Sequence, residues 1–233
     1  MRVLIVSDLH ANLEAVEALP SDFDQLWVLG DLVNYGPNPG EVMEFVRARA
    51  ALVVRGNHDH AAGFGEDPRC SARFRAMAEE TGWHTQSVLS EEQRGYLRGL
   101  PLTATVTADG HEVLLCHAAP SDPLYEYRRE VSPLWLADAV APAITVQLAG
   151  HTHVPFQRLL GTRRIVNPGS VGQPKHGRPE ACYAVWRDGT ITLGSAPYDF
   201  ERTIEKLQGL PLSREVFGDL TYVLRNGEIP AAR

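Results

Sequence analysis

The chain has 233 residues, 44% of them hydrophobic, which is enough for one compact domain with a large core. The formal net charge is −7 and no basic run of five or more residues occurs, which excludes bulk binding to nucleic acid. The three cysteines are odd in number and lack zinc-site spacing, so we expect no disulfide framework and a cytoplasmic location. No apolar stretch reaches the ~18 residues of a membrane span and no signal peptide is recognised, so we expect no membrane partner.

The first part of the chain alternates between short apolar runs and helical patterns. Strands are expected at 2–6, 26–29 and 51–54, and helices at 12–19 and 40–49. Such alternation predicts a parallel sheet with right-handed crossovers. Residues 60–100 lack strand signals. A helical stretch from Arg69 to Thr81 and a helix start at Ser90 predict a helical insertion there.

The second part of the chain is typical of a separate sheet of mixed or antiparallel type. Its expected elements are strands 102–107, 111–116, 144–149, 155–160, 163–167, 181–186 and 190–195, a helix near 132–140 and terminal helices over 199–220, with fraying at 226–233. Two such sheets packed face to face, with helices outside, form a four-layer α/β/β/α sandwich. We expect this α/β fold to be one domain over residues 1–233.

Five short polar motifs follow directly after expected strands. They are Asp8-Leu9-His10, Gly30-Asp31, Gly56-Asn57-His58-Asp59, His117 and Gly150-His151-Thr152-His153. The carboxyl ends of strands in an α/β sheet converge on one edge, where such folds place their sites. Carboxylate, imidazole and amide oxygen together suit divalent ions such as Mn, Fe or Zn. The candidate ligands are too many for one tetrahedral ion, so they predict two ions about 3.5–4 Å apart, an arrangement that recurs in phosphate ester hydrolysis.

Each motif alone also has a simpler interpretation. Gly-Asp after a strand is usually a turn, and Asp59 is in a favourable position for a helix cap. A lone histidine is more often a hydrogen-bonded polar group than a metal ligand. The order of the motifs and their placement after five strands favour the metal site over these alternatives.

The series of motifs resembles the calcineurin-like metallophosphoesterases over about residues 1–170. Three further stretches are similar to a bacterial branch described as phosphoesterases or serine/threonine phosphatase-like proteins: residues 34–39, 167–174, and 198–202 leading to 209–211. Many relatives read His-Gly after the fifth strand, whereas this chain reads His117-Ala118. The resemblance implies the same four-layer fold.

The resemblance also implies which residues bind which ion. Asp8, His10 and His153 would hold the first ion, Asn57, His117 and His151 the second, and Asp31 would bridge both. A hydroxide between the ions would attack phosphorus in line with the leaving oxygen. His58 would act as general acid or hold the phosphoryl group, and Asp59 would orient His58. The two divalent ions are expected among Mn, Fe, Zn, Ni and Co, with manganese favoured.

The expected function is hydrolysis of phosphate mono- or diesters. A small molecule, a nucleotide and a phosphoprotein all stay open as the substrate, as does the oligomeric state. The alternative is a non-catalytic scaffold that binds protein partners, which the complete ligand set disfavours. A metallo-β-lactamase-like hydrolase is disfavoured because the His-x-His motif comes late in the chain.

Other polar residues are weaker candidates. Lys175, His176 and Arg178 follow a glycine-rich stretch and could contact a substrate phosphate, although a solvated loop is the favoured interpretation. The remaining histidines that we expect at the surface are His60, His84 and His111.

Overall fold

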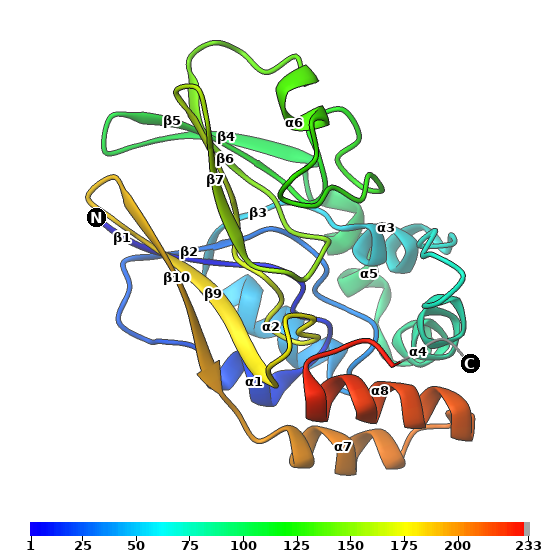
Figure 1. Cartoon of the computed structure of the whole chain (residues 1–233). Coiled ribbons are helices and arrows are strands. Elements are labelled where there is room, and N and C mark those ends of the chain that lie inside the picture. The colour runs from blue at the N-terminus through cyan, green and yellow to red at the C-terminus, as the bar shows by residue number, and fades with distance from the viewer. Residues whose placement is uncertain (231–233) are drawn as a thin grey trace.

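Two five-stranded sheets form the centre of the structure, a computed structural model that describes residues 1–230 (Figure 1). The strand order is β10-β9-β1-β2-β3 in the first sheet and β4-β5-β6-β8-β7 in the second. Eight helices accompany the sheets within the described residues. Both sheets contain parallel and antiparallel pairs. The sequence predicts a mixed or antiparallel sheet for the second part of the chain but a parallel one for the first part.

The first sheet is built on a parallel β-α-β-α-β unit. Its elements are β1 (Arg2–Val6), α1 (Leu13–Glu17), β2 (Gln25–Val28), α2 (Pro39–Arg49) and β3 (Ala50–Val53). β1 pairs in parallel with β2, and β2 with β3. The Asn12 side chain accepts a hydrogen bond from the Ala15 amide at 3.2 Å and so caps α1. The predicted parallel pairing of these three strands is therefore confirmed, within a sheet that is mixed as a whole.

The hairpin of β9 (Glu180–Arg187) and β10 (Thr190–Pro197) extends the first sheet, not the second. β9 runs antiparallel to β1, with Val3 opposite Trp186 and Ile5 opposite Ala184. The expectation that this hairpin belongs to the second sheet is wrong. Pairing with β1 covers the open edge of that strand and buries Trp186 completely, which a local pattern of residues does not reveal.

The second sheet combines two antiparallel pairs with two parallel pairs. Its strands are β4 (Thr103–Ala108), β5 (His111–Cys116), β6 (Ile144–Leu148), β7 (Phe156–Leu160) and β8 (Arg163–Asn167). β4 and β5 are antiparallel, as are β7 and β8, whereas β5 pairs in parallel with β6, and β6 with β8. The hairpin of β4 and β5 turns at Asp109 and Gly110, both with positive φ.

Alternating residues of β1 divide the core into layers. Val3 and Ile5 pack with residues of the second sheet such as Val113, whereas Leu4 and Val6 pack against the helices below. Fully burying one such side chain stabilises the fold by about 1.5–3 kcal/mol. The outer face of the second sheet is covered by the short helix α6 (Leu134–Ala137), whose Trp135 packs with Phe156 and Ile165. The four-layer α/β/β/α sandwich is thus confirmed.

The predicted helical insertion, which connects β3 to β4 along the chain, holds three helices, α3 (Asn57–Phe64), α4 (Arg75–Val88) and α5 (Glu91–Gly99). Ser90 caps α5 as predicted, accepting from the Gln93 amide at 3.2 Å. The helix expected from Arg69 begins instead at Arg75. Arg69 has a φ of 55°, which is incompatible with a right-handed helix.

The chain ends in two helices, α7 (Phe200–Gln208) and α8 (Arg214–Asn226), which pack together beside α4 (Figure 1). Asp199 and Ser213 cap them. α8 continues to Asn226, past the predicted end at 220, and the last part of the predicted frayed end, residues 231–233, lies outside the described residues. Within residues 1–230, no helix is long and apolar enough to cross a bilayer.

Candidate metal centre

The polar motifs meet at one edge of the two sheets. They lie directly beyond strand ends: Asp8 and His10 after β1, Asp31 after β2, Asn57 after β3, His117 after β5, and His151 and His153 after β6. Backbone hydrogen bonds tie these segments together, from the Asp8 amide to Gly30 at 2.9 Å and from the Gly150 amide to His117 at 2.7 Å. The structure brings all seven expected ligands together.

The first group of potential ligands consists of Asp8, His10 and His153. Nε2 of His153 lies 3.2 Å from Oδ1 of Asp8, and Nε2 of His10 lies 3.8 Å from the same oxygen. All three side chains are buried. Their ligand atoms therefore lie within 4.8 Å of one another in the protein interior.

The second group consists of Asp31, His117 and His151, with Asn57 beside them. Nε2 of His117 lies 3.2 Å from Nδ1 of His151 and 3.1 Å from Oδ1 of Asn57. The Asn57 amide nitrogen donates to the Pro68 carbonyl at 2.8 Å, which turns the amide oxygen toward His117. Asn57 thus presents an oxygen to the group, as a neutral ligand would.

Asp31 lies between the two groups. Its Oδ2 is 3.3 Å from Nε2 of His117 and 3.7 Å from Nε2 of His10. Its Oδ1 accepts a hydrogen bond from the His58 amide at 2.9 Å, which fixes the carboxylate in place. One carboxylate oxygen of Asp31 therefore faces both groups.

The hydrogen bonds of the first group fit a bound cation. Nδ1 of His10 lies 3.1 Å from the Val33 carbonyl, and Nδ1 of His153 lies 2.7 Å from the Gln173 carbonyl. A carbonyl only accepts, so each Nδ1 carries the proton and each neutral ring has its lone pair on Nε2. These two Nε2 atoms face each other at 3.2 Å, and Oδ1 of Asp8 has no hydrogen-bond partner among the described residues. A divalent cation between them would satisfy all three atoms.

The protonation states agree with this interpretation. Burial lowers the pKa of His10 and of His153, so both rings are neutral. Burial also disfavours the charged forms of Asp31 and His117. The attraction between the negative Asp31 carboxylate and the positive His117 ring outweighs this effect of burial on both groups. The pKa of Asp31 therefore falls well below its ordinary value, and that of His117 rises to about 9. The Asp31 carboxylate is thus ionised at neutral pH, as metal binding requires, whereas His117 retains a proton that a bound ion would displace.

Most of the candidate ligands have a strained backbone. A positive φ, rare for residues other than glycine, occurs at five of them: Asp8 (55°), His10 (45°), Asp31 (56°), His151 (65°) and His153 (61°). Such conformations are disfavoured by about 1–3 kcal/mol each and cluster at functional sites. The surrounding fold therefore holds these side chains in place at the expense of stability.

Two glycines allow the close packing of the centre. A Cβ at Gly56 would collide with the Asp31 carboxylate, and a Cβ at Gly150 would collide with Ser7 and approach Asp8. The glycines of the Gly-Asn-His-Asp and Gly-His-Thr-His motifs thus have a steric role.

His58 lies at the edge of the centre, with its ring centroid 5.1 Å from that of His10. Its Nδ1 is 2.9 Å from the amide nitrogen of Asn34, and its Nε2 is 3.4 Å from Sγ of Cys70. Burial disfavours the charged ring, but Cys70 and Asp31 outweigh burial and raise the pKa of His58 above its ordinary value. The ring therefore retains a proton more readily than a free histidine.

Asp59 contacts the backbone around Asp31. Its carboxylate accepts from the amides of Asp31 at 2.8 Å, Leu32 at 2.7 Å and Gly56 at 3.0 Å, the last of which caps α3. The ring nitrogens of His58 meet Asn34 and Cys70 instead. The hydrogen bonds thus match the capping alternative for Asp59, and Asn34 is the residue that orients His58.

Lys175 is partly buried rather than standing in a fully solvated loop. Its Nζ lies 4.1 Å from the centroid of the Phe74 ring. Burial lowers its pKa to about 8, against the opposing charges of Asp8 and Asp31. His176 contacts Cys182 instead, and Arg178 is exposed beside Glu180.

The other histidines lie elsewhere. His60 is 3.4 Å from Glu66, His84 is 3.2 Å from the Pro37 carbonyl, and His111 is 3.1 Å from Thr145. All three are partly rather than fully exposed. Sequence reasoning did not select Cys70, which lies in a loop of turn-forming residues with no pattern to single it out.

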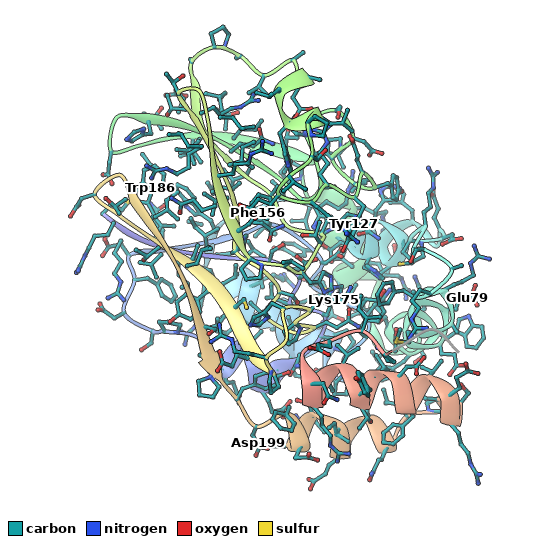
Figure 2. The ribbon with its side chains drawn as sticks, in the orientation of Figure 1. Glu79, Tyr127, Phe156, Lys175, Trp186 and Asp199 are labelled. Atoms are coloured by element: carbon teal, nitrogen blue, oxygen red, sulfur yellow. The ribbon has the colours of Figure 1, made fainter. Side chains whose placement is uncertain are left out.

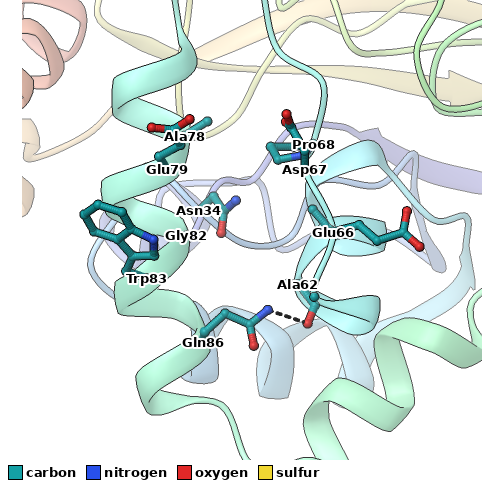
Figure 3. A pocket seen from close by; sticks show the side chains of 12 residues that line it. Asn34, Ala62, Glu66, Asp67, Pro68, Ala78, Glu79, Gly82, Trp83 and Gln86 are labelled. Carbon is teal, nitrogen blue, oxygen red and sulfur yellow. Dashed lines mark hydrogen bonds between the residues drawn. The ribbon is translucent and has the colours of Figure 1, made fainter.

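Two cavities border the centre. The first, which we call the Tyr127 pocket, has a volume of about 370 Å³ and is lined by Tyr127, Arg129, Glu130, Val131, Thr152, Val154, Phe156, Lys175 and Ile229 (Figure 2). The second, of about 290 Å³, lies between α3 and α4 and includes Asn34, Glu79 and the exposed Trp83 (Figure 3).

The calcineurin-like phosphoesterase superfamily domain matches residues 1–187, which include every candidate ligand. This chain belongs to that superfamily. The resemblance inferred from the motifs is therefore confirmed, and the protein is a member of a hydrolase family. The two groups of histidine and aspartate in this phosphoesterase are consistent with a dinuclear metal site.

Individual relatives agree with the family. An uncharacterised protein of Methanocaldococcus jannaschii is 32% identical over 88% of this chain and 91% of its own length. The phosphodiesterase YfcE of Escherichia coli is 29% identical over 83% of this chain and 91% of its own length. The crystal structure of a metallophosphoesterase from Sphaerobacter thermophilus matches with a TM-score of 0.77 and 32% identity, covering 94% of this chain and 98% of that one.

Proposed function

We propose that the chain hydrolyses phosphate mono- or diesters with two divalent ions. The residues that would hold them are Asp8, His10 and His153 for the first ion, Asn57, His117 and His151 for the second, and Asp31 for both. The observation that carries the proposal is the position of Asp31, whose Oδ2 faces a histidine of each group at 3.3 and 3.7 Å. The phosphodiesterase YfcE, similar over most of its length, supports the same class of substrate.

The bound ions would supply a water whose pKa falls from 15.7 to about 7, together with positive charge beside the phosphoryl oxygens. The protein's own part is to hold the ligands in one arrangement. The carbonyls of Val33 and Gln173 fix the rings of His10 and His153 in the tautomer that presents Nε2. Little reorganisation is then needed when substrate binds.

His58 supplies the proton in this proposal. With the Asn34 amide donating to Nδ1, the proton of a neutral His58 ring is on Nε2. That atom faces Cys70 at 3.4 Å rather than a metal ligand, so it is available to a leaving oxygen placed there. The raised pKa of His58 suits an acid near neutral pH. Protonated, the same ring would also attract the phosphoryl group.

Asp59 would act through Asp31. Its carboxylate accepts the amides of Asp31 and Leu32, and so it fixes the backbone that carries the shared carboxylate. We therefore propose Asp59 as a positioning residue rather than one that touches substrate.

The ligand chemistry limits the choice of metal. Imidazole suits Zn, Fe and Ni, while carboxylate and amide oxygens suit Mn, and the site offers both. We favour manganese, with Fe, Zn, Ni and Co as alternatives. A phosphate ester is the proposed partner, and the cytoplasm the proposed compartment.

The test is reconstitution. Protein stripped with EDTA is supplied with Mn²⁺, Fe²⁺, Zn²⁺, Ni²⁺ or Co²⁺ and assayed on phosphomonoesters, phosphodiesters and phosphopeptides. We expect hydrolysis only after an ion is restored, and in H₂¹⁸O we expect the label in the phosphate product. Protein that binds the ions yet stays inert on every ester would contradict the proposal and favour the scaffold alternative.

A further inference from the structure

The Tyr127 pocket adjoins the metal centre directly. The Tyr127 ring lies 5.7 Å from that of His151, and its hydroxyl donates to the Thr152 carbonyl at 3.3 Å. Thr152, which stands between His151 and His153 in the chain, also lines the pocket. A molecule bound at the metal centre could therefore extend into the pocket without crossing solvent.

Several apolar side chains of the pocket lining are exposed, which is unusual for a protein surface. Val131 is 78% exposed and Tyr127 50%, and Val154 and Ile229 are exposed at 41% and 40%. Apolar side chains gathered at one exposed hollow commonly mark a binding site. Figure 2 labels Tyr127, Phe156 and Lys175, three of the residues that line this pocket, near the middle of the view. Such a surface favours an apolar or aromatic group over a strongly hydrated one.

The charges at the pocket are complementary to a phosphate ester. Lys175 and Arg129 supply two cations and Glu130 one anion, so the lining has a net positive charge. Lys175 lines the pocket and follows Gln173 by two residues, and the Gln173 carbonyl lies 2.7 Å from Nδ1 of His153, so this cation stands on the side of the pocket next to the centre. An apolar group carried by an anionic phosphate therefore fits this junction.

The pocket is separate from the place proposed for the leaving group. His58 is contacted by Asn34 and Cys70, and none of these three residues lines the pocket. A phosphomonoester has one organic group, which leaves beside His58 and leaves the pocket empty. A phosphodiester has a second organic group, which stays on phosphorus.

We infer that the Tyr127 pocket binds the retained organic group of a phosphodiester, with preference for an aromatic or apolar group. This inference rests on the proposed phosphoesterase activity. Water adds to phosphorus and releases a proton to solvent, the bond to the leaving oxygen breaks, and His58 protonates that oxygen and is reprotonated by solvent. The products are an alcohol and a phosphomonoester whose organic group occupies the pocket.

The experiment compares two diesters with the same leaving group, phenyl p-nitrophenyl phosphate and methyl p-nitrophenyl phosphate, in the manganese-loaded protein. We expect kcat/KM to be about tenfold higher or more for the phenyl ester, the scale typical of filling an apolar pocket. Val131→Asp should abolish this preference, because it places a hydrated carboxylate in the lining. Leu159→Asp is the matched control, since Leu159 is 66% exposed on β7 but does not line the pocket.

Equilibrium binding gives a readout that does not depend on turnover. Phenylphosphonate and methylphosphonate, which cannot be hydrolysed, are titrated by calorimetry into the same three proteins. We expect phenylphosphonate to bind about tenfold tighter except in Val131→Asp. The ratio between two ligands of equal charge removes the general repulsion that the new carboxylate causes.

The outcomes distinguish failure of the pocket assignment from failure of the proposed phosphoesterase activity. Hydrolysis of both diesters with equal kcat/KM, or a phenyl preference unchanged in Val131→Asp, would overturn the pocket assignment and leave the phosphoesterase activity standing. Hydrolysis of p-nitrophenyl phosphate but of neither diester would overturn it as well. Failure on all three compounds and on the phosphopeptides, with every metal bound, would overturn the proposed function itself.

Discussion

The metal centre and the Tyr127 pocket are neighbours with contrasting construction. Six of the seven candidate ligands are almost fully buried, His151 is partly buried, and all lie beyond strand ends, where backbone carbonyls fix side chains such as those of His10 and His117. The pocket is lined largely by exposed side chains of loops, such as Val131 and Ile229. A rigid scaffold can thus fix the chemistry while loops determine which ester is chosen. Changes at the centre should affect all esters, and changes at the pocket should discriminate among them.

The largest effect is expected from Asp31→Ala, which removes the carboxylate that both ligand groups face. Because each group loses a ligand, we expect metal content to fall and hydrolysis of every ester to become unmeasurable. Metal analysis and assays on mono- and diesters check this. Asp188→Ala, at a side chain that is 79% exposed, is the control and should behave as wild type. Loss of activity on monoesters only, or on diesters only, would contradict the claim that the centre acts on all esters and that the pocket discriminates among them.

The next largest effect is expected from His58→Ala. We expect a loss of about 10²–10⁴-fold in kcat, because a general acid is removed, with metal content unchanged. His60→Ala, two residues further along the same helix, is the matched control. An alkyl ester is the informative substrate, since its leaving oxygen needs a proton most. A rate equal to wild type on that ester would refute the acid role.

A smaller effect is expected from Asp59→Asn. The amide keeps one acceptor oxygen for three backbone donors, so we expect kcat to fall about 10–100-fold through loosening of Asp31. The free energy of unfolding should fall by about 1–3 kcal/mol in denaturant titrations. Asp199→Asn, which preserves a helix cap, should change neither quantity. An unchanged metal affinity in Asp59→Asn would contradict the role of Asp59 in positioning the Asp31 carboxylate.

The smallest effect concerns pH. In the metal-free protein His117 has a pKa raised to about 9, so below that pH an ion must displace its proton. We expect metal affinity to rise about tenfold per pH unit up to about pH 9 and then to level off. Titrations with Mn²⁺ at several pH values measure the slope, and His117→Gln should flatten it. A slope that wild type and His117→Gln share would assign the proton to another group.

The sequence was most informative where chemistry and strand ends coincide. The seven expected ligands could be selected because each follows an apolar run, and those runs form β1, β2, β3, β5 and β6. It did not reveal that β9 pairs with β1, because strand pairing depends on long-range packing of residues such as Trp186. The Asn34 contact to His58 and the position of Cys70 also escaped, since the loops that carry them have positive φ angles at Asn34 and Arg69 that no periodicity encodes.

The most direct test of the central claim is a crystal structure of the manganese-loaded protein with anomalous scattering, together with metal analysis of the same sample. We expect two ions per chain, about 3.5–4 Å apart, one at His10 and His153 and the other at His117 and His151, with the Asp31 carboxylate touching both. A single ion, or two ions of which Asp31 touches only one, would contradict the account.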